Sequence, residues 1–170
     1  RPTGSVTFGA GVSSAEKKRP NEQWAAIGDA DLIKWEKLPK NPILDVKSIP
    51  FEIGPDWRDP FIFKAEGRTF MVLGADTKDE AIVPIFEAET PQLDKWTYKG
   101  ILYRQPKDKV QFFECPNFFP LDGKWVLIAG RTNGLHGFST TSTVNFPPQF
   151  QNRDVWVIDP ATMKVVDKFK

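Results

Sequence analysis

The chain has 170 residues, and its 14 Phe and 6 Trp supply the apolar surface for a sizeable core. Its net charge is +1 with both signs interspersed, which excludes a basic nucleic-acid footprint or a polybasic membrane patch. A single cysteine, Cys115, and a single histidine, His136, exclude a disulfide framework and a thiolate metal site, so we expect no metal and no cofactor. The sequence leaves the cellular compartment open.

The first third of the chain reads as short strands separated by turns. Residues 1–12 predict one strand and a turn, and Gln23 to Gly28 predict a short apolar strand. Ala25 to Lys37 also fit a helix on propensity, but we favour strand and turn because a similar segment downstream lies between clear strands. The Pro-rich stretch from Leu38 to Asp56 reads as a connection.

A first full hairpin is predicted from Trp57 to Ala75, with Glu66-Gly67 at its turn. Ala81 to Ala88 form a third strand, in which Pro84 suits an edge or a bulge. Trp96 to Tyr103 follow as an outer strand.

A second full hairpin runs from Gln111 to Gly130, with the strong turn signal Asp122-Gly123. A polar Gly/Ser/Thr loop from Arg131 to Asn145 comes next. Asp154 to Asp159 and Lys164 to Phe169 then predict a closing hairpin.

Two segments of the sequence are repeated. The segment that begins at Asp59-Pro60 aligns with the one at Cys115-Pro116 without a gap, at an offset of 56 residues. Leu32 to Trp35 match Leu93 to Trp96 at an offset of 61. Hairpin repeats of this length indicate β-propeller blades, with a sandwich of similar hairpins as the alternative.

The fold class we predict is therefore all-β, with about three blades of a propeller in one partial domain spanning residues 1–170. A blade remnant occupies residues 1–50, and full repeats occupy about 51–105 and 106–170.

An acid, Asp59 or Glu114, precedes each full hairpin at nearly the same position. Equivalent positions on successive blades lie side by side around a propeller axis, so the two carboxylates would meet, as sugar-bond cleavage requires. A single acid of this kind more often caps a turn or pairs with a cation such as Arg58. Two at related positions favour a site.

The motifs Asn41-Pro42-Ile43-Leu44, Trp57-Arg58-Asp59-Pro60 and Phe113-Glu114-Cys115-Pro116 stand in this order along the chain. Over roughly residues 20–130 the sequence resembles glycoside hydrolase family 32. That family contains invertases, levanases, inulinases and related fructosyl-transferring enzymes.

The resemblance implies a five-bladed propeller that cleaves β-fructofuranosides of the sucrose, levan or inulin type by retaining double displacement. Glu114 would be the general acid/base and Asp59 the transition-state stabiliser. Arg58 would bind the sugar and hold the Glu114 carboxylate. Further substrate contacts would come from Trp57, stacking on a sugar ring, and from Cys115, whose side chain we expect to be a small buried hydrophobe rather than a nucleophile.

The family's nucleophile motif, of the Trp-Met-Asn-Asp-Pro-Asn-Gly type, has no match in this sequence. We therefore expect an internal piece of a longer hydrolase, inactive alone, whose open sheet faces favour self-association or pairing with the missing blades. Three alternatives remain: a natural short homologue that kept only sugar binding, a non-catalytic carbohydrate-binding propeller fragment, and a related propeller glycosidase acting on arabinosides or xylosides.

Overall fold

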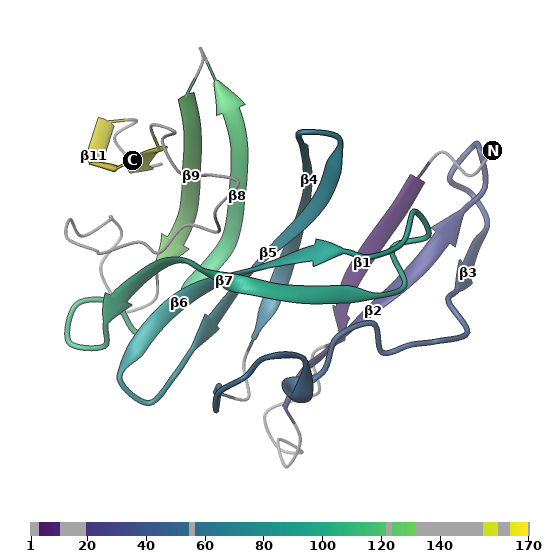
Figure 1. Ribbon diagram of the computed structural model, residues 1–170, viewed down its shortest axis with the longest axis horizontal. Coiled ribbons are helices and arrows are strands. Elements are labelled where there is room, and N and C mark those ends of the chain that lie inside the picture. Colours follow the sequence, from purple (N-terminus) through teal and green to yellow (C-terminus); the bar gives the residue numbers. More distant parts are fainter. Residues whose placement is uncertain are drawn as a thin grey trace.

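The protein is built from three β-sheets placed side by side (Figure 1). The computed structural model describes the backbone of residues 4–10, 20–54, 57–121, 124–131, 155–159 and 164–169. Its elements are β1 (Gly4–Ala10), β2 (Glu22–Gly28), β3 (Trp35–Lys37), the 3-10 turn η1 (Val46–Ser48), β4 (Arg58–Ala65), β5 (Arg68–Asp76), β6 (Glu80–Ala88), β7 (Trp96–Pro106), β8 (Phe113–Leu121), β9 (Lys124–Arg131), β10 (Val155–Asp159) and β11 (Lys164–Phe169). The described part of the chain is all-β apart from η1, as the sequence predicted.

The central sheet is a four-stranded antiparallel meander in the order β4-β5-β6-β7. Glu66 and Gly67 connect β4 to β5 and both have positive φ (53° and 74°), the backbone twist of a tight hairpin. Pro84 lies at a register shift between β6 and β7, so it occupies a bulge in an interior strand. The predicted first hairpin, third strand and outer strand are all confirmed.

The third sheet has the order β8-β9-β10-β11 and repeats the hairpin of the central sheet. β8 pairs with β9 in antiparallel register up to Leu121 and Lys124, while the predicted turn residues 122–123 lie outside the described residues. β10 and β11 form the predicted closing hairpin. β10 runs parallel to β9, a pairing that requires a long connection and that the simple hairpin pattern did not predict.

The first sheet, β1-β2-β3, confirms strand and turn rather than helix after residue 25. Its β2–β3 loop has the same conformation as the β6–β7 loop. Leu32 and Leu93 both take positive φ (57° and 58°), and the indole nitrogens of Trp35 and Trp96 donate to their carbonyls at 2.8 and 3.0 Å. The sequence echo at an offset of 61 is therefore a structural repeat.

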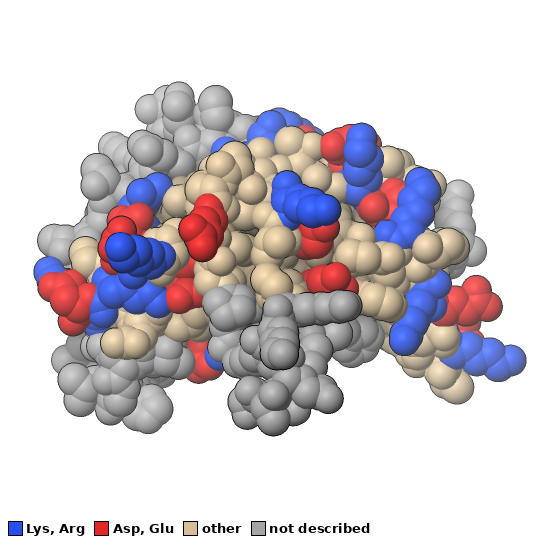
Figure 2. Space-filling view, turned by 90° about the horizontal axis from the view of Figure 1, so that it is seen from below, with Lys and Arg blue, Asp and Glu red and all other residues tan. Residues whose placement is uncertain are grey.

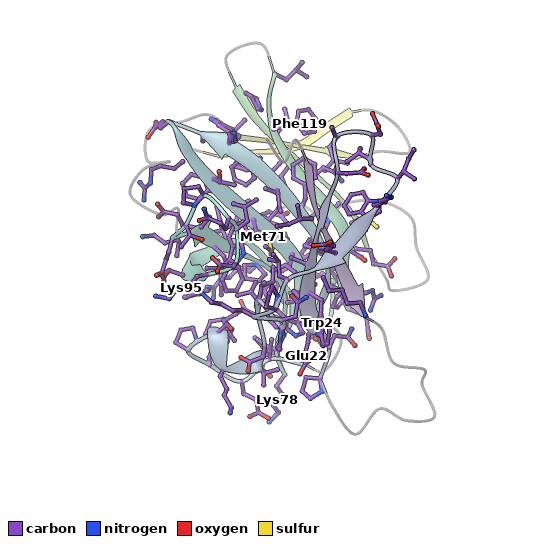
Figure 3. The ribbon with its side chains drawn as sticks, turned by 90° about the vertical axis from the view of Figure 1, so that its right-hand side faces the viewer. Glu22, Trp24, Met71, Lys78, Lys95 and Phe119 are labelled. Carbon is purple, nitrogen blue, oxygen red and sulfur yellow. The ribbon has the colours of Figure 1, made fainter. Side chains whose placement is uncertain are left out.

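Two apolar clusters fill the spaces on either side of the central sheet. Successive side chains of a strand point to opposite faces, and in β5 Phe70 and Val72 join one cluster while Met71 and Leu73 join the other. The first cluster is shared with β8 and β9. The second is shared with β2 and the connection to β4, and Met71 lies in this interior in Figure 3. Each fully buried side chain of this size contributes about 1.5–3 kcal/mol.

Face-to-face packing of hairpin sheets is the arrangement of propeller blades, and it brings β8 against β4 and β5. On the face shown in Figure 2, Lys and Arg side chains alternate with Asp and Glu. No helix in the described ranges is long and apolar enough to cross a membrane.

Candidate active site

Arg58 and Glu114 form an ion pair that connects the start of β4 in the central sheet to the start of β8 in the third sheet. Arg58 begins β4 and Glu114 is the second residue of β8, and the Arg58 Nη2 to Glu114 Oε1 distance is 2.6 Å. The two residues are equivalent in the repeat: Arg58 lies opposite Gly74 in its hairpin, and Glu114 lies opposite Gly130. Their side chains are 30% and 40% exposed, so the pair is open to solvent on one side.

Asp59 joins the same guanidinium from the other side. Its Oδ2 lies 3.7 Å from Nε of Arg58 and accepts the backbone N–H of Cys115 at 3.0 Å. Both predicted carboxylates therefore contact one guanidinium. Strictly, Asp59 is the repeat equivalent of Cys115 rather than of Glu114, so the two acids stand one position apart in the repeat.

A bulge at the start of each hairpin aims these side chains. The register shifts after Arg58 in β4 and after Glu114 in β8, and the next residues, Asp59 and Cys115, have positive φ (61° and 47°). Asn117 Nδ2 donates to the Cys115 carbonyl at 2.7 Å and fixes the second bulge. Bulges of this kind re-aim side chains beside functional sites, and non-glycine residues with positive φ are uncommon.

Phe112 lies under the guanidinium of Arg58, with 4.5 Å from Cζ to the ring centroid. This contact places the flat face of the cation on an aromatic ring while its edge reaches the carboxylates. Phe112 was not singled out as a site residue from the sequence; its place directly before the Phe113-Glu114 motif is the only signal.

The structure corrects the expectation that the Cys115 side chain is buried, since the residue is exposed. Its Sγ lies 3.6 Å from Oδ2 of Asp59. Partial desolvation raises the pKa of the thiol, the carboxylates of Asp59 and Glu114 raise it further, and Arg58 only partly opposes them. The thiol is therefore protonated at neutral pH, which argues against a nucleophilic role.

The structure also corrects the expectation that Trp57 stacks on a sugar ring. Trp57 is 0% exposed, packs on Phe86, and donates its indole N–H to the carbonyl of Asn21. Its own carbonyl accepts a bond from Gln23 Nε2 at 3.1 Å. With no exposed face, Trp57 anchors the start of β4 to the first sheet and thereby supports Arg58 from behind.

In the described ranges no three His, Cys, Asp or Glu side chains are grouped so that they could hold a metal ion. His136 lies outside the described residues. The described site therefore consists of two carboxylates held on one guanidinium.

The fold places the protein among the β-propellers. A beta-fructofuranosidase from Bombyx mori matches 75% of this chain and 26% of its own chain, with a TM-score of 0.61 at 22% identity. A sucrose-6-phosphate hydrolase from Lactobacillus gasseri matches 74% of this chain and 25% of its own, with a TM-score of 0.59 at 23% identity. At these identities the likeness is one of fold.

Residues 4–167 match the family described as "Glycosyl hydrolases family 32 N-terminal domain", so the chain belongs to glycoside hydrolase family 32. The sucrose-6-phosphate hydrolase of Vibrio alginolyticus is 32% identical over 73 residues, which are 42% of this chain and 15% of that protein. A probable sucrose-6-phosphate hydrolase of Psychromonas ingrahamii is 29% identical over 86 residues, 50% of this chain and 15% of that protein. The matched segments thus cover about a seventh of the length of these curated relatives.

Proposed function

We propose that this chain carries part of the active site of a hydrolase that cleaves β-fructofuranosides. The observation that carries the proposal is the single guanidinium of Arg58, which holds Glu114 at 2.6 Å and Asp59 at 3.7 Å. The names of the relatives support the substrate class, because they include sucrose-6-phosphate hydrolases and a beta-fructofuranosidase variant in complex with sucrose.

In this proposal Glu114 is the general acid/base. Its carboxyl, which is more exposed than that of Asp59, protonates the leaving oxygen of the fructoside and later removes a proton from the attacking water. Asp59 stabilises the positive charge that develops on the sugar, while Arg58 orients both acids. Retaining cleavage also needs a nucleophilic carboxylate about 5 Å from the acid. We place that third carboxylate outside the residues of this chain.

The test uses the full-length protein in which this chain occurs. We expect Glu114→Gln to lower kcat for release of fructose from sucrose or levan by about 10²–10⁴-fold, because the amide keeps the shape of the side chain but cannot transfer a proton. Glu36→Gln, at an exposed glutamate of β3, is the matched control and retains full turnover.

Unchanged turnover in Glu114→Gln would remove the acid/base assignment. A wild-type protein that binds levan without releasing fructose would favour the non-catalytic carbohydrate-binding alternative. Release of arabinose or xylose instead of fructose would favour the related propeller glycosidases.

A further inference from the structure

The backbone of β8 closely approaches β5 at Gly74. A Cβ atom at this position would lie 1.9 Å from the carbonyl oxygen of Phe113 and 3.2 Å from Cε1 of Phe112. The first contact is impossible for real atoms, and because it involves backbone no side-chain rotation relieves it. Only a residue without a side chain fits at this point of β5.

This contact lies directly beside the ion pair of the candidate site. Gly74 is the cross-strand neighbour of Arg58, and Phe113 immediately precedes Glu114. Residues opposite each other in an antiparallel pair project to the same face of the sheet. The missing side chain of Gly74 therefore leaves the space on the Arg58 side into which the β8 backbone fits.

We propose that Gly74 is a positioning residue of the active site: by admitting the Phe113 carbonyl against β5, it sets the separation at which Arg58 holds Glu114. The expected loss of activity rests on the proposed function, whereas the expected change in the Arg58–Glu114 distance rests only on the Gly74–Phe113 contact. A side chain here moves the start of β8 away from β4 and pulls Glu114 off the guanidinium.

The repeat supplies a matched comparison in Gly130. This glycine lies opposite Glu114 as Gly74 lies opposite Arg58. A Cβ on Gly130 would lie 3.6 Å from both Cβ and the carbonyl oxygen of Glu114, which is ordinary van der Waals contact. Alanine substitution at these two equivalent positions therefore compares a site where the added Cβ clashes with backbone and a site where it fits.

The first experiment measures hydrolysis of sucrose by the full-length protein. Because a displacement of about 1 Å costs on the order of 10²-fold, we expect Gly74→Ala to lower kcat/KM by that amount and Gly130→Ala to leave it near the wild-type value. Adding Gly74→Ala to Glu114→Gln should cause no further loss, since Gly74 acts through Glu114. A further loss in the double variant would indicate a general structural role and overturn the proposal.

The second experiment does not depend on activity. Crystal structures of the wild type, Gly74→Ala and Gly130→Ala should show the Arg58–Glu114 bond broken only in Gly74→Ala. Retention of that bond in Gly74→Ala overturns the positioning role, as does a wild-type structure in which Phe113 stands clear of Gly74. A Gly74→Ala protein that does not fold, beside a folded Gly130→Ala protein, also overturns it.

A wild type without fructosidase activity but with the expected geometry would refute the proposed function and leave the positioning role supported.

Discussion

Arg58 contacts three other side chains of the candidate site. It contacts Glu114, Asp59 and the ring of Phe112, and each contact uses a different part of the guanidinium group. A planar cation with several donors can hold two carboxylates and lie on an aromatic ring at once, whereas a lysine ammonium offers a point charge without the flat face. The site therefore depends on the geometry of this residue as much as on its charge.

The pKa of the Cys115 thiol depends on the two carboxylates beside it. Partial desolvation, Asp59 and Glu114 all raise the thiol pKa, so at pH 8 only a small fraction is the reactive thiolate. Removing the charge of Asp59 lowers that pKa, and we expect Asp59→Asn to speed alkylation by iodoacetamide roughly 3- to 10-fold at pH 8. Since the chain has one cysteine, the rate is read directly from mass spectrometry of the intact chain.

Asp31→Asn, at an exposed aspartate of the β2–β3 loop, serves as the control and should alkylate at the wild-type rate. An Asp59→Asn protein that alkylates no faster than this control would contradict the electrostatic coupling between Asp59 and Cys115.

At the scale of elements, the two repeated loops have the same conformation in different surroundings. Trp96 is 7% exposed and belongs to the second apolar cluster, whereas Trp35 is 37% exposed. Each donates one indole hydrogen bond to the carbonyl three residues earlier. We expect Trp96→Phe to lower the free energy of unfolding by about 2–3 kcal/mol, through a cavity and the loss of a partly buried hydrogen bond, and Trp35→Phe by roughly 0.5–1 kcal/mol.

Urea unfolding followed by circular dichroism measures both values, and each variant is the control for the other. Equal losses in the two variants would show that burial of the loop by the neighbouring sheet adds nothing to the shared hydrogen bond.

The hairpins at this scale were predictable, whereas the geometry at their starts was not. Glu66-Gly67 occupies the predicted turn because glycine takes positive φ at no steric cost. The bulges at Asp59 and Cys115 carry no such signal, since a residue before proline ordinarily takes an extended conformation. The two bulges contact each other across the sheets through the bond from Cys115 N–H to Asp59, a long-range contact that no local pattern records.

At the scale of the whole molecule, the sequence repeat predicted which residues come together but not which become buried. Arg58, Asp59 and Glu114 meet because equivalent ends of adjacent hairpin sheets meet. Trp57 is buried because Asn21 and Phe86, from two other parts of the chain, close over it. Such burial depends on long-range packing that no local pattern records. The parallel pairing of β9 and β10 is a second feature of this kind.

The whole chain should be sensitive to acid through the carboxylates of the central sheet. Glu87 in β6 is bonded to Arg68 of β5 and Lys99 of β7, so one carboxylate ties three strands together. Burial alone would raise the pKa of Glu87, but hydrogen bonds from Arg68 and Lys99 hold it below its ordinary 4.5. Asp94, bonded to Thr90 and to Lys40 in the connection after the first sheet, also has a lowered pKa.

A carboxyl whose pKa is lowered by folding contributes stability that is full above its unfolded pKa and is lost as the pH falls through its folded pKa. We therefore expect the urea midpoint to be constant from pH 7 to 5 and to fall below about pH 4.5, the ordinary pKa of Glu87. Glu87→Gln should lower the midpoint at pH 7 and flatten its decline in acid, because the amide cannot be protonated in this range. Glu52→Gln, at an exposed glutamate, should leave the profile unchanged. A decline as steep in Glu87→Gln as in the wild type would show that acid acts on the fold through other groups.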